Sequence, residues 1–179
     1  MNKENKVDKA MIKEMTESTY VVEVDSDIKE LIGKTLIEWV IQNGEDWVIF
    51  RTSDNKLYKM FHRQIGAEIV DIRHIQGYIN DAFHSPILMA EKSTDDKPHA
   101  GFKLSEMREK ILKRKCPIDF YEADDDEEVF TWTYDDLKSF TWTSYKLTTI
   151  KGILTINWCG FSNGCYSEEI DFIELKEKA

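Results

Sequence analysis

The sequence predicts an α+β fold, a strongly bent antiparallel β-sheet or open barrel with an N-terminal helix and an inserted helix. Three observations lead to this prediction. Residues 35–62 and 140–172 are rich in β-branched and aromatic residues, and turn sequences interrupt them. Residues 104–115 carry an apolar stripe at helical spacing, and a weaker stripe lies near the N-terminus.

The first 24 residues are predicted to form a helical arm ahead of a single domain at 25–179. Val7, Met11 and Met15 share one helical face among Lys and Glu residues, which is typical of a short amphipathic helix. The N-terminal arm and the domain are therefore expected to differ in structure.

The domain is predicted to begin with a short capped helix and an antiparallel meander. Asp25-Ser-Asp27 can cap the helix, and Gly33 can end it. Asn43-Gly44 and Ser53-Asp-Asn55 supply turns between segments of strand character. The strands expected in this half are 35–42, 45–51, 56–62, 68–75 and 87–91, with a helical turn at 78–83 before the last.

Residues 140–172 are predicted to form a three-strand meander. Lys151-Gly152 separates the first two strands, and Ser162-Asn163-Gly164 has the sequence of a hairpin turn. The motif Phe-Thr-Trp-Thr at 130–133 recurs at 140–143, which suggests two strands joined by a turn. The aromatic residues here either pair in the core or form a platform for stacking bases: Trp132, Trp142, Tyr145 and Trp158.

Residues 92–128 are predicted to be an insertion in the domain. A polar loop at 92–97 leads to a helix at 104–115, which Cys116-Pro117 ends. The helix carries a basic cluster that either contacts nucleic acid or neutralises the acidic residues that follow: Arg108, Lys110, Lys113, Arg114 and Lys115.

An acidic run follows at 119–128, where seven of ten residues carry carboxylates. Such a run is a solvated loop, a surface that binds a basic partner, or a site for divalent ions. It lacks the glycine and the spacing of an EF-hand loop. The residues predicted to bind a partner are Asp119, Glu122, Asp124, Asp125, Asp126, Glu127 and Glu128.

The composition indicates a soluble protein of the cytoplasm. The formal net charge of −10 repels phosphate backbones and favours partners with basic grooves, although it also serves solubility. Nothing resembles a signal peptide, and no apolar run approaches the ~20 residues that a membrane helix needs. Cys116, Cys159 and Cys165 are odd in number and lack CxxC spacing, which favours reduced thiols over a disulfide framework, with a Cys159–Cys165 bridge across the hairpin as the alternative.

The candidate catalytic residues are few, and no cofactor is predicted. The four histidines lack the spacing of metal ligands. An unbroken strand would place His62, Gln64 and Glu68 on one face, but Gly66 favours a bulge there. A fainter pattern, similar to the acidic-acidic-lysine arrangement of metal-dependent nucleases, consists of Asp171, Glu174 and Lys176.

The sequence T-W-T-x-Y-K-L-x-T-I-K-G followed by W-x-G-x-S-N-G-x-Y-S-E-x-x-D-F, within 140–172, resembles the signature of a small domain family common in bacteriophages and mobile elements. Residues 47–62, then Gln64, Glu68 and Val70, and then residues 85–91 resemble the same family. The resemblance implies no assigned activity. Gly66 and Ala67 stand where it leads us to expect a cysteine pair, which argues against thiol chemistry, and residues 94–129 do not match it.

Together these features lead us to expect a phage-type anti-defence inhibitor, of which an anti-CRISPR protein is one kind. It would bind a basic nucleic-acid-handling host protein through its acidic surface, and would contact nucleic acid directly only through the basic cluster of the inserted helix. Two alternatives stay open. One is a metal-assisted nuclease or RNA-processing factor that uses His62, Glu68 or the acidic run, and the other is a structural or assembly domain whose charges confer only solubility.

Overall fold

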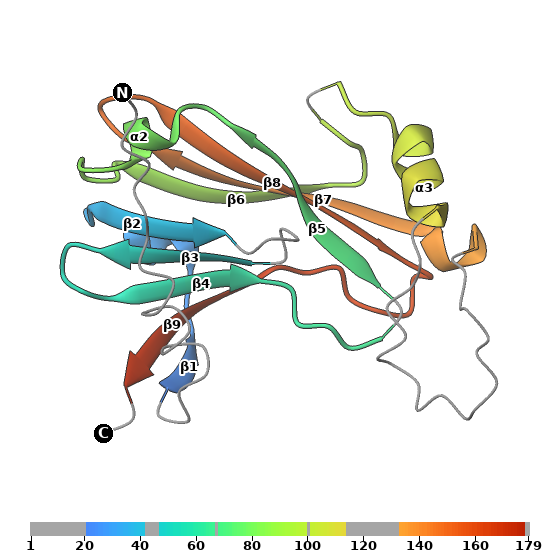
Figure 1. Ribbon diagram of the computed structural model, residues 1–179, viewed down its shortest axis with the longest axis horizontal. Helices are drawn as coiled ribbons and strands as arrows, with labels where there is room; N and C mark the ends of the chain where they lie inside the picture. The colour runs from blue at the N-terminus through green and yellow to red at the C-terminus, as the bar shows by residue number, and fades with distance from the viewer. Residues whose placement is uncertain (1–20, 42–46, 67, 100, 114–132, 178–179) are drawn as a thin grey trace.

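A computed structural model describes residues 21–41, 47–66, 68–99, 101–113 and 133–177. They form two antiparallel β-sheets, which lie one above the other in Figure 1. The five-stranded sheet has the strand order β1-β9-β4-β3-β2, and the four-stranded sheet has the order β5-β8-β7-β6.

The five-stranded sheet contains the meander that the first half of the sequence predicts. Its strands β2, β3 and β4 pair in succession, as expected from their alternating polarity and the turn at Asn55, whose φ is 61°. The predicted turn at Asn43-Gly44 lies outside the described residues. The strands of this sheet are β1 (Val21–Asp25), β2 (Leu36–Ile41), β3 (Trp47–Thr52), β4 (Leu57–Phe61) and β9 (Asp171–Glu177).

The four-stranded sheet is built around a long hairpin. Its strands are β5 (Ile69–Gln76), β6 (Met89–Asp95), β7 (Ser139–Thr148) and β8 (Ile153–Ser162). The hairpin of β7 and β8 confirms the first two strands predicted for 140–172, and the second Phe-Thr-Trp-Thr motif lies in β7. Strand β6 continues to Asp95, so the polar loop expected from residue 92 is wrong there. As an edge strand with exposed side chains, β6 has no apolar alternation to reveal it.

The predicted three-strand meander at 140–172 is wrong in its third strand. Strand β9 pairs with β1 and β4 in the other sheet and makes no pair with β8. The chain does turn after β8, where Gly164 has a φ of 89°, but it then crosses to the five-stranded sheet. This crossover places Phe172 opposite Met60 of β4 and in the common core.

The α+β fold class is wrong, because the described chain is mainly β and consists of two antiparallel sheets. Its helical segments are short: α2 (Ile79–Ala82), α3 (Leu104–Leu112), and the 3₁₀ turns η1 (Ile28–Leu31) and η3 (Asp135–Leu137). Asp27 caps η1 by accepting a hydrogen bond from Lys29 N at 2.8 Å, as its sequence predicts. The inserted helix is confirmed over α3. Of the predicted N-terminal helical arm, 1–24, residues 1–20 lie outside the described residues, and residues 21–24 are wrong as helix because they belong to strand β1.

Both faces of the four-stranded sheet are apolar in part. The inner face packs against the five-stranded sheet, and Trp158 donates from Nε1 to Met60 Sδ across the interface at 3.2 Å. The outer face carries α3, whose Met107 and Ile111 cluster with Trp142. Trp142, Tyr145 and Trp158 are at most 1% exposed, which confirms their core role, whereas Trp132 lies outside the described residues. In the described part of the chain, no helix has the length and apolar character needed to cross a bilayer.

Candidate functional site

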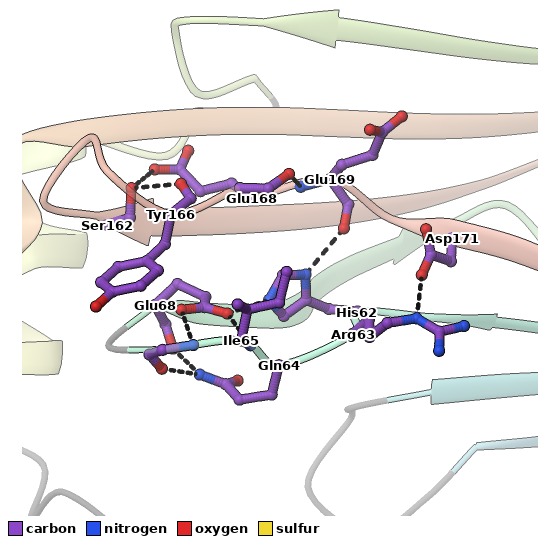
Figure 2. A network of polar contacts seen from close by, with 12 residues as sticks. His62, Arg63, Gln64, Ile65, Glu68, Ser162, Tyr166, Glu168, Glu169 and Asp171 are labelled. Atoms are coloured by element: carbon purple, nitrogen blue, oxygen red, sulfur yellow. Dashed lines mark hydrogen bonds and ion pairs between the residues drawn. The ribbon is translucent and has the colours of Figure 1, made fainter. Parts of the chain in front are cut away.

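Two connections between the sheets lie side by side, and a network of polar contacts runs through them (Figure 2). The first joins β4 to β5, and the second joins β8 to β9. His62 links them, because its Nδ1 lies 2.9 Å from the backbone oxygen of Glu169 in the second connection. We call these segments, 62–68 and 163–170, the two crossovers.

Glu68 is the centre of the first crossover. Its Oε1 lies 3.1 Å from His62 Nε2 and accepts a hydrogen bond from Ile65 N at 2.5 Å, while its Oε2 accepts one from Gly66 N at 2.8 Å. The side chains of His62 and Glu68 are 5% and 0% exposed. Both ring nitrogens of His62 face oxygen acceptors, so both act as donors only when the ring is an imidazolium, which then pairs with Glu68.

Gln64 completes this network through the backbone. Its Nε2 donates to Gly66 O at 2.6 Å and to Glu68 O at 2.8 Å. The structure therefore brings together the three residues that the sequence singled out, although by a different route. They meet in the connection between β4 and β5, rather than on one face of an unbroken strand.

The second crossover comes so close to Gly66 that this position has no room for a side chain. A Cβ built on Gly66 would lie 2.2 Å from the ring of Tyr166, in the second crossover. The His62, Gln64 and Glu68 side chains are thus committed to bonds that hold the two crossovers in place. A general base needs a lone pair directed at a reactant, and a metal ligand needs one directed at the metal ion. This network is therefore better suited to a structural role.

A second candidate site is a groove beside the second crossover. It has a volume of about 760 Å³ and lies between the residues that follow β1, strands β6 and β7, and the segment from Ser167 to Phe172. Lys92 of β6 donates to Ile170 O at 3.2 Å, and Tyr145 of β7 donates from its hydroxyl to the same oxygen at 3.0 Å. Burial raises the pKa of Tyr145, which keeps this hydroxyl a donor.

The lining of the groove is acidic. Two lysines also line it, Lys29 and Lys92, and Lys92 Nζ lies 3.1 Å from Glu169 Oε1. The carboxylates of the lining outnumber these two lysines. The carboxylate residues are Asp25, Asp27, Glu168, Glu169 and Asp171. An acidic recess of this kind attracts cationic groups.

Sequence reasoning missed this groove because its residues come from four separate segments. The hairpin turn predicted at Ser162-Asn163-Gly164 would place Glu168 on a strand beside β8. The signal in the sequence is Ser-Glu-Glu at 167–169, which puts two acidic residues before the apolar Ile170 and the strand that follows it.

The remaining predicted residues do not converge. Asp171 and Glu174 are an odd number of positions apart on β9 and so point to opposite faces. Asp171 pairs with Arg63, and Glu174 pairs with Lys56 and Lys176. Within the described ranges, no group of three or more His, Cys, Asp or Glu side chains is arranged to hold a metal ion.

The predicted partner-binding residues of the acidic run, 119–128, lie outside the described residues. So do Arg114 and Lys115 of the basic cluster. Of the rest of that cluster, Arg108 donates to the backbone oxygen of Lys138 at 3.3 Å, while Lys110 and Lys113 are exposed. Cys159 is buried beneath α3, and Cys165 is exposed in the second crossover.

No curated protein and no solved structure matches the chain. One family model does match, over residues 29–172, and it includes strands β2 to β8, both crossovers and helix α3, while β1 and most of β9 lie outside it. Its description is Domain of unknown function (DUF7448). Because the match extends over most of the sequence, the chain belongs to this uncharacterised domain family.

Proposed function

We propose that the protein acts by binding rather than by catalysis, as an inhibitor of a basic nucleic-acid-handling protein. The proposal includes a phage-type anti-defence role, such as that of an anti-CRISPR protein, with a host protein of the cytoplasm as the partner. The acidic groove supports it most directly, because five carboxylates and two lysines line one recess.

The charge of the whole chain supports the same proposal. The formal net charge is −10, and the acidic run at 119–128 adds seven carboxylates to those of the groove. Complementary charge accelerates the encounter with a basic protein and selects against acidic partners. Direct binding of nucleic acid is disfavoured, since the described groove would repel phosphates.

The alternative of a metal-assisted nuclease receives less support from the geometry. The side chains of His62 and Glu68 form hydrogen bonds with each other and with backbone atoms. The alternative of an assembly domain with solubilising charges would not require the carboxylates to gather in one recess.

The test is affinity capture of basic proteins from a nuclease-treated bacterial lysate at low and high salt. One variant neutralises the seven carboxylates of the acidic run as amides, and another carries Asp25→Asn with Glu169→Gln in the groove. A control variant carries Glu91→Gln with Glu109→Gln, which are exposed carboxylates outside the lining of the groove. The wild type and the control should retain a basic protein that elutes as salt rises, because exposed charges are screened within about 10 Å at 0.1 M.

Retention of the basic protein should fall in the variant with the neutralised acidic run or in the Asp25→Asn, Glu169→Gln variant. The melting temperatures of both variants should equal that of the wild type. Equal retention by all variants at all salt concentrations would refute the electrostatic proposal. Multiple-turnover cleavage of RNA or DNA that needs Mg²⁺ and is lost with Glu68→Gln in a folded protein would favour the nuclease instead.

A further inference from the structure

We propose that the groove holds a guanidinium group against Glu168. This inference rests on the proposed function and specifies its chemistry, because it assigns an arginine side chain of the basic partner, or a small guanidinium compound, to one named carboxylate. It goes beyond the general acidity of the surface, since it depends on one oxygen atom.

That atom is Oε2 of Glu168. The residue is only 6% exposed and lines the groove. Its Oε1 accepts a hydrogen bond from Ser162 Oγ at 2.7 Å, whereas Oε2 is covered and has no hydrogen-bond partner among the described residues. A buried carboxylate oxygen without a donor costs free energy, so the position favours a ligand that brings donors.

The Glu168 carboxylate is held in a fixed position before any ligand arrives. Its side chain lies against Gly160 of β8, where an added Cβ would come within 2.6 Å of Glu168 Cβ. Ser162 is fully buried, and its Oγ accepts a hydrogen bond from Gly164 N at 3.1 Å and lies 3.1 Å from the backbone oxygen of Tyr166, so the oxygen atom that contacts Oε1 is fixed in position. A site organised in this way loses little conformational entropy when it binds.

The surroundings of Glu168 suit a guanidinium group. Thr141 pairs with Gly160 in the sheet, and both Thr141 and Thr143 line the groove. A threonine hydroxyl can accept hydrogen bonds. A guanidinium offers five donors in a planar fork, so one group can serve the Oε2 atom and neighbouring oxygens together. An ammonium group carries the same charge but lacks the fork.

The first experiment is a titration of the full-length protein with N-acetyl-arginine methylamide, followed by amide NMR signals. We expect saturable shifts at residues 141–145 and 167–172. The citrulline analogue, which is neutral and nearly isosteric, should produce none. Glu168→Gln should weaken binding by about tenfold or more, because it removes the charge but keeps an acceptor for Ser162.

The matched control is Glu169→Gln, which removes the same charge from an exposed residue of the same groove. It should weaken binding less than about threefold, as expected for a solvated charge. Equal losses in the two variants would overturn the assignment to Glu168, and so would an unchanged affinity in Glu168→Gln. Tighter binding of the lysine analogue than of the arginine analogue would overturn the choice of guanidinium.

A second comparison separates the sources of the group. A Gly-Ser-Arg-Ser-Gly peptide that binds more tightly than the free amide supports an arginine of a protein, whereas equal or weaker binding supports a small guanidinium compound. Absence of any arginine-dependent shift overturns this inference alone if capture of a basic protein still depends on the acidic run. Specific arginine binding without any basic protein captured would sustain this inference and refute the proposed function.

Discussion

Glu68 and Glu168 are both buried carboxylates, and each lies in one of the two crossovers that join the sheets. Glu68 contacts three donor groups with its two oxygens, from His62, Ile65 and Gly66. Glu168 has one donor, on one oxygen. The difference indicates that burial alone does not identify a functional carboxylate, and that unsatisfied bonding capacity beside a groove is the more informative property.

The largest effect should come from exchanging each carboxylate for its amide. In Glu68→Gln, an amide NH₂ replaces an acceptor in front of an N–H donor, so we expect a loss of about 2–4 kcal/mol in the free energy of unfolding. In Glu168→Gln, the remaining oxygen can still bind Ser162, and the loss should stay within about 1 kcal/mol. Urea denaturation of both variants measures this difference, and similar losses would show that the two environments are equivalent.

A smaller effect on stability is expected when a neighbouring substitution shifts the Glu168 side chain and leaves Glu168 itself unchanged. In Gly160→Ala, the new methyl group would meet Glu168 Cβ at 2.6 Å and Cγ at 3.0 Å. We expect a loss of about 1–3 kcal/mol from overpacking, together with loss of binding of the arginine amide. Thermal unfolding and the NMR titration test both parts. Retained arginine binding in Gly160→Ala would indicate that the position of Glu168 is not critical.

Tyr58 tests whether an unpartnered buried atom matters when it lies away from the groove. Its hydroxyl has no hydrogen-bond partner among the described residues, and Tyr58 does not line the groove. We expect Tyr58→Phe to change stability by less than about 1 kcal/mol and to leave arginine binding unchanged. A loss of arginine binding in this variant would weaken the distinction between the two kinds of buried oxygen.

The ionisation of Tyr58 should also lower the stability of the folded state at alkaline pH. Burial raises the pKa of Tyr58 from 10.0 to about 12, so the folded state holds the phenolic proton more tightly than the unfolded state does. Its stabilising contribution is complete below pH 10 and is lost as the pH rises through about 12. Melting temperatures of the wild type should fall more steeply over this range than those of Tyr58→Phe. Parallel curves would contradict the assignment.

Local patterns in the sequence predict much of the fold. Alternating polarity and turn residues identify β2, β3 and β4, and the same signals identify β7 and β8. The path of β9 could not be predicted in this way, because its pairing with β1 and β4 depends on contacts between residues far apart in the chain. Phe172 reaches the common core only after the crossover, and nothing near it in the sequence indicates which sheet it joins.

The candidate sites were predicted to different extents for the same reason. His62, Gln64 and Glu68 lie within seven residues of one another, so sequence alone could group them. The groove brings together Asp27, Lys92, Thr143 and Glu168, which lie too far apart in the sequence to be recognised as one group. The acidic run was visible from its composition, but composition does not determine what faces it.

The contact between His62 and Glu169 also has a consequence for the order of folding. These residues are 107 positions apart, so this hydrogen bond closes a long loop and gains nothing until both sheets are largely formed. We therefore expect it to be absent from the folding transition state. In stopped-flow measurements, His62→Ala should accelerate unfolding and leave the refolding rate nearly unchanged. The contact between the crossovers would then form after the transition state and lengthen the lifetime of the native state.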